Sequence, residues 1–362
     1  MKKINVCIIG CGMIANSAHI PAYKANEKDY EIVAVCDNFT DNAKKTAENN
    51  GIDRWYTNPE EMLKAEKPDV VSVCAPNMFH KECVMLALSY GANVLCEKPL
   101  GLFFSEVKEM FDFAKKQGKL LMACQSLRFL PERLKAKELV DSGEVGDIYY
   151  AQMSRIRRRG IPTWGKFHIK AYSGGGALVD IGIHGIDSAI WLMGNPTPYS
   201  VTAVMNKVHT EELGSAKGSG ALKGNVDTSG FNPDEMDVES FANGTVKFKN
   251  GSSLSFRVSW AANLKDENNI TLSGSKCGID IESREIYRNE SDIEDLEVIP
   301  NGFKDNPFYG HFCLVENFAK VIKGEAELFV KPQETLNATA IVEAAYLSAK
   351  ENREITFEEI IK

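Results

Sequence analysis

A glycine-rich turn lies near the start of the chain, in the segment IIGCGMIA. Gly10 and Gly12 stand two apart, and the small residue Ala15 follows three positions beyond the second glycine. Where a strand turns into a helix, the first glycine permits the tight turn, the second lets the backbone approach a pyrophosphate, and the small residue lets the helix lie close to the strand. The helix start also offers unpaired N–H groups to phosphates. A tight turn without a ligand would use the same residues. The surrounding sequence therefore decides between a dinucleotide-binding turn and a turn without a ligand.

An acidic residue, Asp37, supplies that context at the end of the next expected strand, EIVAVCD. Dinucleotide-binding folds place a ribose-binding carboxylate about 20 residues after the glycine turn. The Asp37 carboxylate can accept hydrogen bonds from a ribose diol and would repel a 2′-phosphate, and the neighbouring Asn38 and Phe39 offer no cation to offset that repulsion. The sequence therefore predicts a dinucleotide site that prefers NAD to NADP.

A lysine, Lys98, directly follows the apolar run VLC and precedes Pro99. This places it at the carboxyl end of an expected parallel strand, where open α/β sheets bind their ligands. The proline fixes the turn and can orient the lysine side chain. A surface lysine is the alternative interpretation of the same position.

A carboxylate and an imidazole, Asp180 and His184, stand four residues apart in a helical pattern and so share one face of the helix. The carboxylate can orient the imidazole and raise its basicity. Oxidation of an alcohol requires loss of a hydride to the nicotinamide and removal of the hydroxyl proton, and a histidine suits the second task near neutral pH. A helix-capping aspartate and a satisfied core histidine are the alternative.

The elements that must position these residues alternate between strands and helices through the first third of the chain. Expected buried strands are INVCIIG, EIVAVCD, DVVSVCAP, NVLCEKP and KLLMACQ, and expected helices are DNAKKTAENN, PEEMLKAE, NMFHKECVMLALSYG and FSEVKEMFDFAKKQG. The last two helices end at Gly91 and Gly118, where a C-cap glycine is expected. This alternation predicts right-handed βαβ units and a doubly wound parallel sheet, a Rossmann domain over residues 1–125.

Residues 126–362 are expected to form a second, α/β domain for substrate binding and oligomerisation, built on an open, mostly antiparallel sheet. The strand pair FANGTVKFKNGSSLSFRVSW turns at Asn250 and Gly251, and helical patterns occur in PERLKAKELVDSG, GALVDIGIHGIDSAIWLMG, FYGHFCLVENFAKVIKG and PQETLNATAIVEAAYLSAKEN. Residues 212–235, rich in Gly, Ser, Asn and Asp, read as a surface excursion. Because such a sheet leaves one face unprotected, we expect copies of the chain to form a homo-oligomer through it.

The composition limits the class of protein. A chain of 362 residues predicts about two domains. A net charge of -8, with only the short basic cluster Arg155–Arg159, argues against a nucleic-acid surface. No stretch approaches the roughly 18 apolar residues of a membrane span, and the glycines interrupt the N-terminal apolar run, which therefore reads as a strand rather than a signal peptide. Nine cysteines without a Cys-x-x-Cys pair suggest buried thiols in a reducing cytoplasm, with neither disulfides nor a metal.

Three further segments carry a resemblance to a known family: APNMFH from Ala75, CEKPLG from Cys96 and GGGALVDIGIHGID from Gly174. With the glycine turn, and with HIPAYK, LRF at Arg128 and SW at Trp260, they make nearly the whole chain similar to the glucose-fructose oxidoreductase and inositol dehydrogenase (Gfo/Idh/MocA) family. The resemblance implies that Asp180 and His184 are the catalytic pair, with His184 as the acid/base. It also implies that Lys98 stabilises oxyanion character as the hydroxyl becomes a carbonyl.

The expected cofactor is NAD. The residues expected to bind it are Gly10, Gly12, Met13, Ile14, Asp37, Asn38, Ala75, Pro76, Asn77, His80, Glu97, Lys98 and Gln125. For His80 a structural place in the helix is an equal alternative, and Pro76 and Asn77 could also be a strand exit and a helix N-cap. His19 fits helix-terminal packing and is not included.

The substrate side is expected in RIRRRGIPTWGKFHIK, which precedes the catalytic helix. Arg159 offers a fork of donors for hydroxyl groups, Trp164 an indole face for pyranose C–H bonds, and Asn263 follows the SW strand. RRRGIPTWG is similar to a branch of the family that includes enzymes oxidising the C3 hydroxyl of glucosides. The resemblance thus implies an NAD-dependent dehydrogenase of a secondary hydroxyl on a sugar, glycoside or cyclitol. An NAD-using glycosidase acting through a transient 3-keto sugar, and a non-catalytic sugar-sensing regulator, are the alternatives.

Overall fold

The computed structural model describes residues 2–207, 231–289, 293–298 and 306–362. The chain forms two compact units: unit 1 comprises Met1–Phe129 and Pro300–Thr335, and unit 2 comprises Leu130–Ile299 and Leu336–Lys362. The expected boundary at residue 125 lies near the end of the first segment of unit 1. The return of the chain to unit 1 after residue 299 differs from the expected division into two continuous domains.

Unit 1 is built on a six-stranded sheet in the order β3-β2-β1-β4-β5-β6, in which every neighbouring pair is parallel. Its strands are β1 (Ile4–Ile9), β2 (Tyr30–Cys36), β3 (Trp55–Tyr56), β4 (Val70–Val73), β5 (Asn93–Cys96) and β6 (Leu121–Ala123). All four residues of β4 are buried, as in a sheet covered on both faces. The five strands expected from the sequence are confirmed, whereas β3 is too short to show a pattern.

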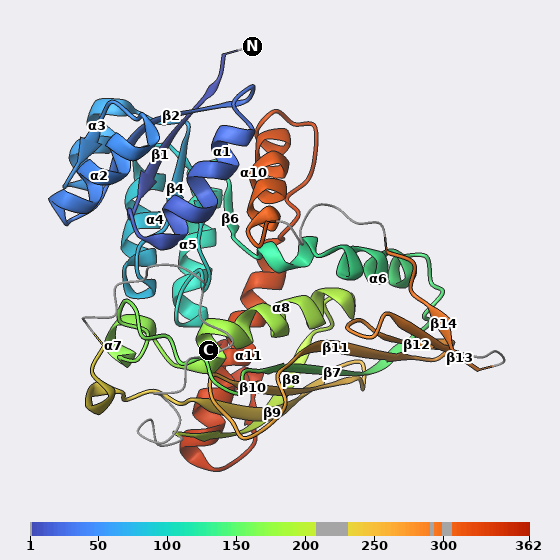
Figure 1. Cartoon of the computed structure of the whole chain (residues 1–362). Helices are drawn as coiled ribbons and strands as arrows, with labels where there is room; N and C mark the ends of the chain where they lie inside the picture. The colour runs from blue at the N-terminus through green and yellow to red at the C-terminus, as the bar shows by residue number, and fades with distance from the viewer. Residues whose placement is uncertain (1, 208–230, 290–292, 299–305) are drawn as a thin grey trace. The chain divides into compact units, whose positions relative to one another are not determined.

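Apart from the last turn, η3, which follows β6, the helices in the first segment of unit 1 lie between these strands, as expected (Figure 1). They are the π-helix η1 (Ala15–His19), α1 (Ile20–Ala25), α2 (Thr40–Asn50), α3 (Pro59–Glu66), the 3-10 turn η2 (Asn77–Phe79), α4 (His80–Ser89), α5 (Phe104–Lys116) and the 3-10 turn η3 (Ser126–Phe129). The chain beyond α4 and α5 turns at Gly91 and Gly118, whose φ angles of 80° and 62° confirm the expected left-handed C-cap glycines.

Helix α10 (Tyr309–Ile322) is the element by which the chain rejoins unit 1, where it lies beside α1 (Figure 1). The Tyr30 hydroxyl donates a hydrogen bond to the backbone oxygen of Val315 over 3.0 Å, and Lys323 pairs with Asp29 at 2.6 Å. The helical pattern of this segment predicts a helix with an apolar face, but it does not specify which surface that face covers. The structure thus groups α10 with unit 1, whereas the sequence-based division assigned it to residues 126–362.

Unit 2 is built on a nine-stranded sheet in the order β14-β13-β12-β11-β7-β10-β9-β8-β15. Its strands are β7 (Ile148–Ile156), β8 (Pro198–Asn206), β9 (Phe241–Phe248), β10 (Ser253–Ser259), β11 (Glu267–Gly274), β12 (Cys277–Asp280), β13 (Glu285–Arg288), β14 (Glu294–Asp295) and β15 (Ile355–Thr356). Strands β7 and β10 pair in parallel, and the other pairs are antiparallel, which confirms the mostly antiparallel sheet. The hairpin of β9 and β10 turns through Asn250 and Gly251, as expected.

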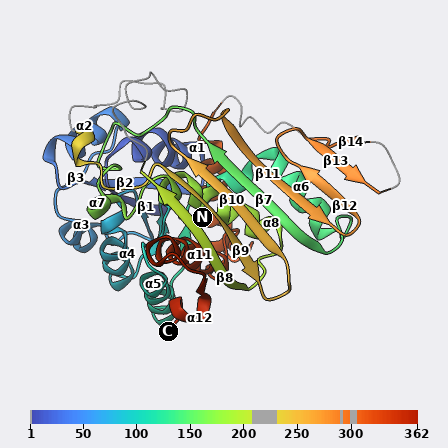
Figure 2. The ribbon, with the colours of Figure 1, turned by 90° about the horizontal axis from the view of Figure 1, so that it is seen from below.

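The helices of unit 2 are α6 (Pro131–Asp141), α7 (Lys170–Ser173), the π-helix η4 (Leu178–Gly182), α8 (Ile183–Leu192), the 3-10 turn η5 (Pro233–Glu235), α11 (Pro332–Glu351), which begins in unit 1, and α12 (Phe357–Ile360). A Cβ atom on Gly185 of α8 would lie 2.5 Å from the sulfur of Met153 in β7, so this helix packs tightly on the sheet. Figure 2 shows the opposite face, where the strands lie in front of α6 and α8. Of the expected excursion at 212–235, residues 212–230 lie outside the described part.

Two further observations concern thiols and membranes. All nine cysteines are free, and eight of them are buried, with Cys313 half-buried. Within the described residues, no helix has the length and the apolar character needed to cross a membrane.

Candidate active site

The loops at the carboxyl edge of the unit 1 sheet carry the residues expected to bind the cofactor. The sheet is parallel, so the loops that follow β1, β2, β4, β5 and β6 all leave the same edge. The strand order reverses between β1 and β4, which is where open α/β sheets bind their ligands. The residues that follow these strands are Gly10 to Ile14, Asp37 and Asn38, Ala75 to Asn77, Glu97 and Lys98, and Gln125.

The glycine turn has the geometry that its spacing predicts. Gly10 has a φ of 93°, and a Cβ atom there would lie 2.6 Å from the carbonyl carbon of Cys74, so only glycine fits without movement of the backbone. No atom lies within 4 Å of the corresponding position on Gly12, which leaves room for a ligand to approach the backbone. Ala15 is fully buried. The side chain of Asn16 donates to the carbonyl oxygens of Cys11 and Gly12, both at 3.0 Å, and holds the turn in place.

Asp37 is oriented by backbone amides at the end of β2. Its Oδ2 accepts the Cys11 N–H over 2.8 Å, and its Oδ1 accepts the Phe39 N–H over 2.9 Å. The third donor in the described part of the chain is the Asn42 side chain at 3.5 Å, so none of the groups that hold the carboxylate is a cation. This environment fits the ribose diol of NAD and offers nothing to neutralise a 2′-phosphate.

Gln125 gives a second test of whether these loops fit a dinucleotide. Its side chain is 3% exposed, and its Oε1 is buried with no hydrogen-bond partner among the described residues. Buried polar atoms are nearly always paired, so an orphaned acceptor in a ligand-binding loop is consistent with a partner supplied by a bound group. With the open position at Gly12 and the carboxylate of Asp37, unit 1 fits the cofactor that the sequence predicts.

His80 holds two of these loops together. The ring is fully buried at the start of α4, with its Nδ1 2.7 Å from the carbonyl oxygen of Pro99 and its Nε2 2.8 Å from that of Ala75. Burial lowers the pKa of His80, although both carbonyl contacts oppose this shift. Both ring nitrogens of His80 thus contact backbone carbonyl oxygens, and a role at the cofactor stays a prediction. Its ring joins the loop after β4 to the Lys98–Pro99 turn, whose peptide bond is cis.

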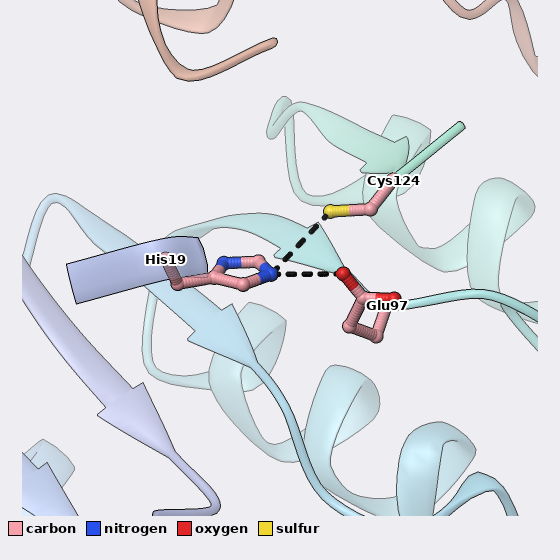
Figure 3. A group of neighbouring side chains, drawn as sticks. All are labelled: His19, Glu97 and Cys124. Carbon is pink, nitrogen blue, oxygen red and sulfur yellow. Dashed lines mark hydrogen bonds and ion pairs between the residues drawn. The ribbon is translucent and has the colours of Figure 1, made fainter. Parts of the chain in front are cut away.

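Glu97 directly precedes Lys98 and belongs to a buried polar cluster (Figure 3). Its Oε1 is 2.9 Å from Nε2 of His19 and 3.0 Å from Nε2 of His311. Burial by itself would raise the pKa of Glu97, but the hydrogen bonds from the two histidines hold that pKa well below its usual range. The thiol of Cys124 lies 4.0 Å from Nε2 of His19, and burial raises its pKa well above the usual value. Glu97 is therefore a buried carboxylate ion.

The second expected constellation lies in unit 2. Asp180 belongs to the π-helix η4, and His184 to α8, which continues it without a break. Such π segments within α-helices are frequent at functional sites. The indole Nε1 of Trp260, a fully buried residue, donates to Oδ2 of Asp180 over 2.9 Å. This hydrogen bond is one of the contacts that orient the Asp180 carboxylate.

A buried glutamate secures the start of the same helix. Glu239 accepts the N–H of Gly176 at 3.0 Å, the N–H of Leu178 at 2.9 Å and the hydroxyl of Tyr346 at 2.8 Å. Burial raises the pKa of Glu239. The glutamate occupies the position of a helix N-cap, where it satisfies amides that have no partner within the helix.

The expected substrate residues are partly brought together. The Arg159 guanidinium donates to the side-chain oxygen of Asn263 over 3.1 Å and to the backbone oxygen of Arg158 over 2.7 Å. Trp164 makes an edge contact with Phe167, with the ring centroids 6.4 Å apart. Arg159 and Asn263 therefore form one polar group, and Trp164 belongs to a separate aromatic pair.

Four residues of these sites were not found from the sequence. Asn16 and Glu239 act through backbone groups, which no side-chain motif reveals. Trp260 was noticed only as part of the family resemblance, and His19 was set aside as packing. A signal for His19 existed, because a histidine on the first helix is placed near the switch point of the sheet, but its partner Glu97 could be identified only from the fold.

Comparison with known proteins defines the class. Residues 4–124 match the model described as an oxidoreductase family with an NAD-binding Rossmann fold, and residues 134–280 match the GFO/IDH/MocA C-terminal domain. Together they cover most of the chain. The chain belongs to the Gfo/Idh/MocA family and is an NAD-dependent oxidoreductase, as expected from the sequence.

Particular relatives refine the comparison. The chain is 33% identical to the D-glucoside 3-dehydrogenase of Escherichia coli strain K12 over 352 residues, which make up 96% of each chain. Aldose-aldose oxidoreductase from Caulobacter crescentus, solved in complex with glycerol, has a TM-score of 0.79 and 23% identity, covering 98% of this chain and 100% of that one. Myo-inositol 2-dehydrogenase from Lactobacillus plantarum has a TM-score of 0.77 and 22% identity, with coverage of 98% and 99%. The two structures show the shared fold.

Proposed function

We propose that this protein oxidises a secondary hydroxyl of a sugar, glycoside or cyclitol to a ketone, with NAD as the hydride acceptor and C3 of a glucoside as the carbon oxidised. The observation that carries the proposal is the 33% identity to D-glucoside 3-dehydrogenase along 96% of both chains. The presence of Lys98, Asp180 and His184 supports catalysis rather than a sensing role, which would tolerate their loss.

The proposed chemistry assigns each of these residues one task. NAD held by the loops of unit 1 would supply the acceptor for the hydride of the alcohol carbon, and the alcohol oxygen loses a proton. The His184 imidazole takes that proton as the general base and returns it in the reverse reaction. Asp180, held by Trp260, orients the imidazole. The Lys98 ammonium stabilises the negative charge that develops on the oxygen.

The substrate is proposed to contact unit 2 through Arg159, Trp164 and Asn263. The hydrogen bond from Arg159 to Asn263 supports this proposal, because it holds the guanidinium in one orientation before a sugar binds. A truncated side chain in this group, as in Arg159→Ala, is expected to raise KM for the sugar more than it lowers kcat. An unchanged KM would remove Arg159 from the substrate site.

The test of the proposed function mixes the full chain with NAD and a panel of glucosides, free sugars and inositols, and follows NADH by absorbance and products by mass spectrometry. We expect a ketone from a glucoside, and about 10² to 10⁴ times slower turnover in His184→Ala with NAD binding retained. Undiminished turnover in that variant would remove His184 from the mechanism. Release of the aglycone without net NADH would favour a glycosidase, and no product from any compound would favour a regulator.

We also propose that the chain forms a homo-oligomer through the sheet of unit 2. Gln152, Ser255, Thr245 and Thr271 lie opposite one another on neighbouring strands and point away from the side that carries Met153, which packs on α8. Figure 2 shows strands β7, β9 and β10 at the front of this face. The row of polar side chains on this face fits a hydrogen-bonded interface rather than an apolar one. Light scattering of the wild type and of Ser255→Arg tests the proposal. A bulky charge in the middle of that row should dissociate the oligomer, and an unchanged molar mass would contradict the proposed interface.

The reaction is proposed to take place in the cytoplasm. Nine free cysteines, eight of them buried, support a reducing compartment, since an oxidising one favours disulfides. Fractionation of cells that express the full chain tests this localisation.

A further inference from the structure

The proposed function leaves unexplained a buried polar cluster that joins three distant parts of unit 1. His19 comes from η1, Glu97 from the end of β5 and His311 from α10. All three side chains are buried, and one carboxylate oxygen of Glu97 contacts both imidazoles, at 2.9 Å and 3.0 Å. A buried carboxylate with two histidine partners costs desolvation energy, so it requires a structural or functional explanation.

The contacts fix where the protons of this cluster lie. Oε1 of Glu97 is an acceptor, so each histidine donates its Nε2 proton to it. Nδ1 of His19 then accepts from the Ser72 hydroxyl at 2.7 Å, and Ser72 in turn accepts from Tyr23 at 3.2 Å. Burial lowers the pKa of His19, which keeps its ring neutral. The chain of donors therefore runs in one direction, from Tyr23 to Glu97.

The second oxygen of Glu97 faces the residue proposed to stabilise the oxyanion. Its Oε2 accepts the backbone N–H of Lys98 over 3.2 Å. On the other side of Lys98, the carbonyl oxygen of Pro99 lies 2.7 Å from Nδ1 of His80. Buried side chains thus hold the backbone on both sides of Lys98, and the hold on its N–H depends on the orientation of Glu97.

We propose that His19 and His311 are positioning residues, which hold the Glu97 carboxylate in the one orientation that fixes the backbone of Lys98 for catalysis. The inference rests on the proposed role of Lys98 and deepens it. It also gives the return of the chain to unit 1 a functional purpose, because α10 delivers His311 to a turn more than 200 residues earlier. A displacement of about 1 Å at a catalytic group can cost on the order of 10² in rate.

A metal ion is the competing explanation. His19, Glu97 and Cys124 offer donor atoms within 4.8 Å of one another (Figure 3). A cation would need the Nε2 lone pair of His19 and the thiolate of Cys124. The hydrogen bond to Glu97 uses the Nε2 of His19 as a donor instead, and burial raises the pKa of the Cys124 thiol well above its usual value. The hydrogen-bonded form is thus complete without an ion.

The test compares three variants of the full chain. His311→Leu removes one donor to Glu97, His311→Gln keeps an N–H at about the distance of Nε2, and Tyr30→Phe is the matched control. The Tyr30 hydroxyl also connects α10 with the rest of unit 1, through its hydrogen bond to Val315, and no hydrogen bond joins it to Glu97 among the described residues. We expect His311→Leu to lower kcat about 10- to 100-fold with little change in KM for NAD, His311→Gln to recover most of that loss, and Tyr30→Phe to keep wild-type kcat.

A second readout does not depend on turnover. Amide hydrogen exchange of the peptide that contains Lys98 is expected to accelerate at least about tenfold in His311→Leu but not in Tyr30→Phe. Three results would each overturn the inference: unchanged exchange in His311→Leu, equal losses of kcat in His311→Leu and Tyr30→Phe, or one equivalent of zinc in the purified protein.

Lys98→Ala separates the positioning role from the proposed role of Lys98. Full activity in that variant refutes the proposed role of Lys98. An inactive Lys98→Ala with an active His311→Leu refutes only the positioning role.

Discussion

Trp260→Phe removes one hydrogen-bond donor to Asp180 and little else. The indole Nε1 lies 2.9 Å from Oδ2 of Asp180, and Trp260 is fully buried. Phenylalanine keeps an aromatic ring in the same space but has no N–H. The half-buried carboxylate then loses this partner.

The magnitude follows from two contributions. A hydrogen bond to a charged group contributes about 1.5–3 kcal/mol to stability. The smaller ring leaves a void of roughly 40 Å³, which at about 24 cal/mol per Å³ adds about 1 kcal/mol. We therefore expect unit 2 to lose about 2.5–4 kcal/mol, or roughly 5–15 °C in Tm. Because Asp180 loses this orienting hydrogen bond, we expect kcat to fall about 10- to 100-fold at a temperature where the variant is fully folded.

The assay measures kcat and the urea midpoint of Trp260→Phe beside those of Trp191→Phe. Trp191 is also buried, at 7% exposure, and lies on α8 two turns beyond His184. The control loses the same volume of side chain within α8 itself and should keep wild-type kcat. A Trp260→Phe enzyme with undiminished kcat would refute the reasoning that Asp180 must be held by the indole, and so would an equal loss in Trp191→Phe.

Three further predictions concern unit 1. Asp37→Ala should relax the preference for NAD, measured as the ratio of dissociation constants for NAD and NADP; tighter binding of NADP by the wild type would contradict the role of Asp37. Gly10→Ala should destabilise the fold by about 1–3 kcal/mol, because its Cβ would lie 2.6 Å from Cys74, whereas Gly12→Ala, with no atom within 4 Å, should keep the urea midpoint and lose NAD affinity. Burial lowers the pKa of His19 below 6.5, so its contribution to stability is present above about pH 6.5 and is lost as the pH falls. His19→Gln should therefore flatten the fall in stability between about pH 7 and pH 5 by up to about 1.4 kcal/mol per pH unit, and an unchanged slope would contradict this.

The fold could be predicted largely because its signals are local. Buried strands such as β4 and β5 are short β-branched runs bounded by helical patterns, and glycines such as Gly91 mark the ends of helices. The place of α10 could not be predicted, because a helical pattern does not name the surface that its apolar face covers. Strand β3 could not be predicted either, because two residues are too few to show a pattern, and pairing with β2 positions them.

The residues of the candidate site also fall into two groups, those that the sequence reveals and those that only the fold reveals. Gly10, Asp37 and Lys98 could be found from their types and spacing at strand ends. The groups that orient such residues could not be found, because their partners are brought together by tertiary structure. Trp260 reaches Asp180 from 80 residues away, and His311 reaches Glu97 from 214 residues away.

The measurement that tests the central claim most directly follows a deuterium atom. The wild-type chain is incubated with NAD and a glucoside that carries deuterium at C3, and the cofactor is recovered by denaturation and examined by mass spectrometry. The proposed function predicts that the deuterium is found on the reduced nicotinamide and that the sugar product is the 3-keto glucoside. Reduced cofactor without deuterium, or a C3 that keeps its deuterium while product accumulates, would contradict it.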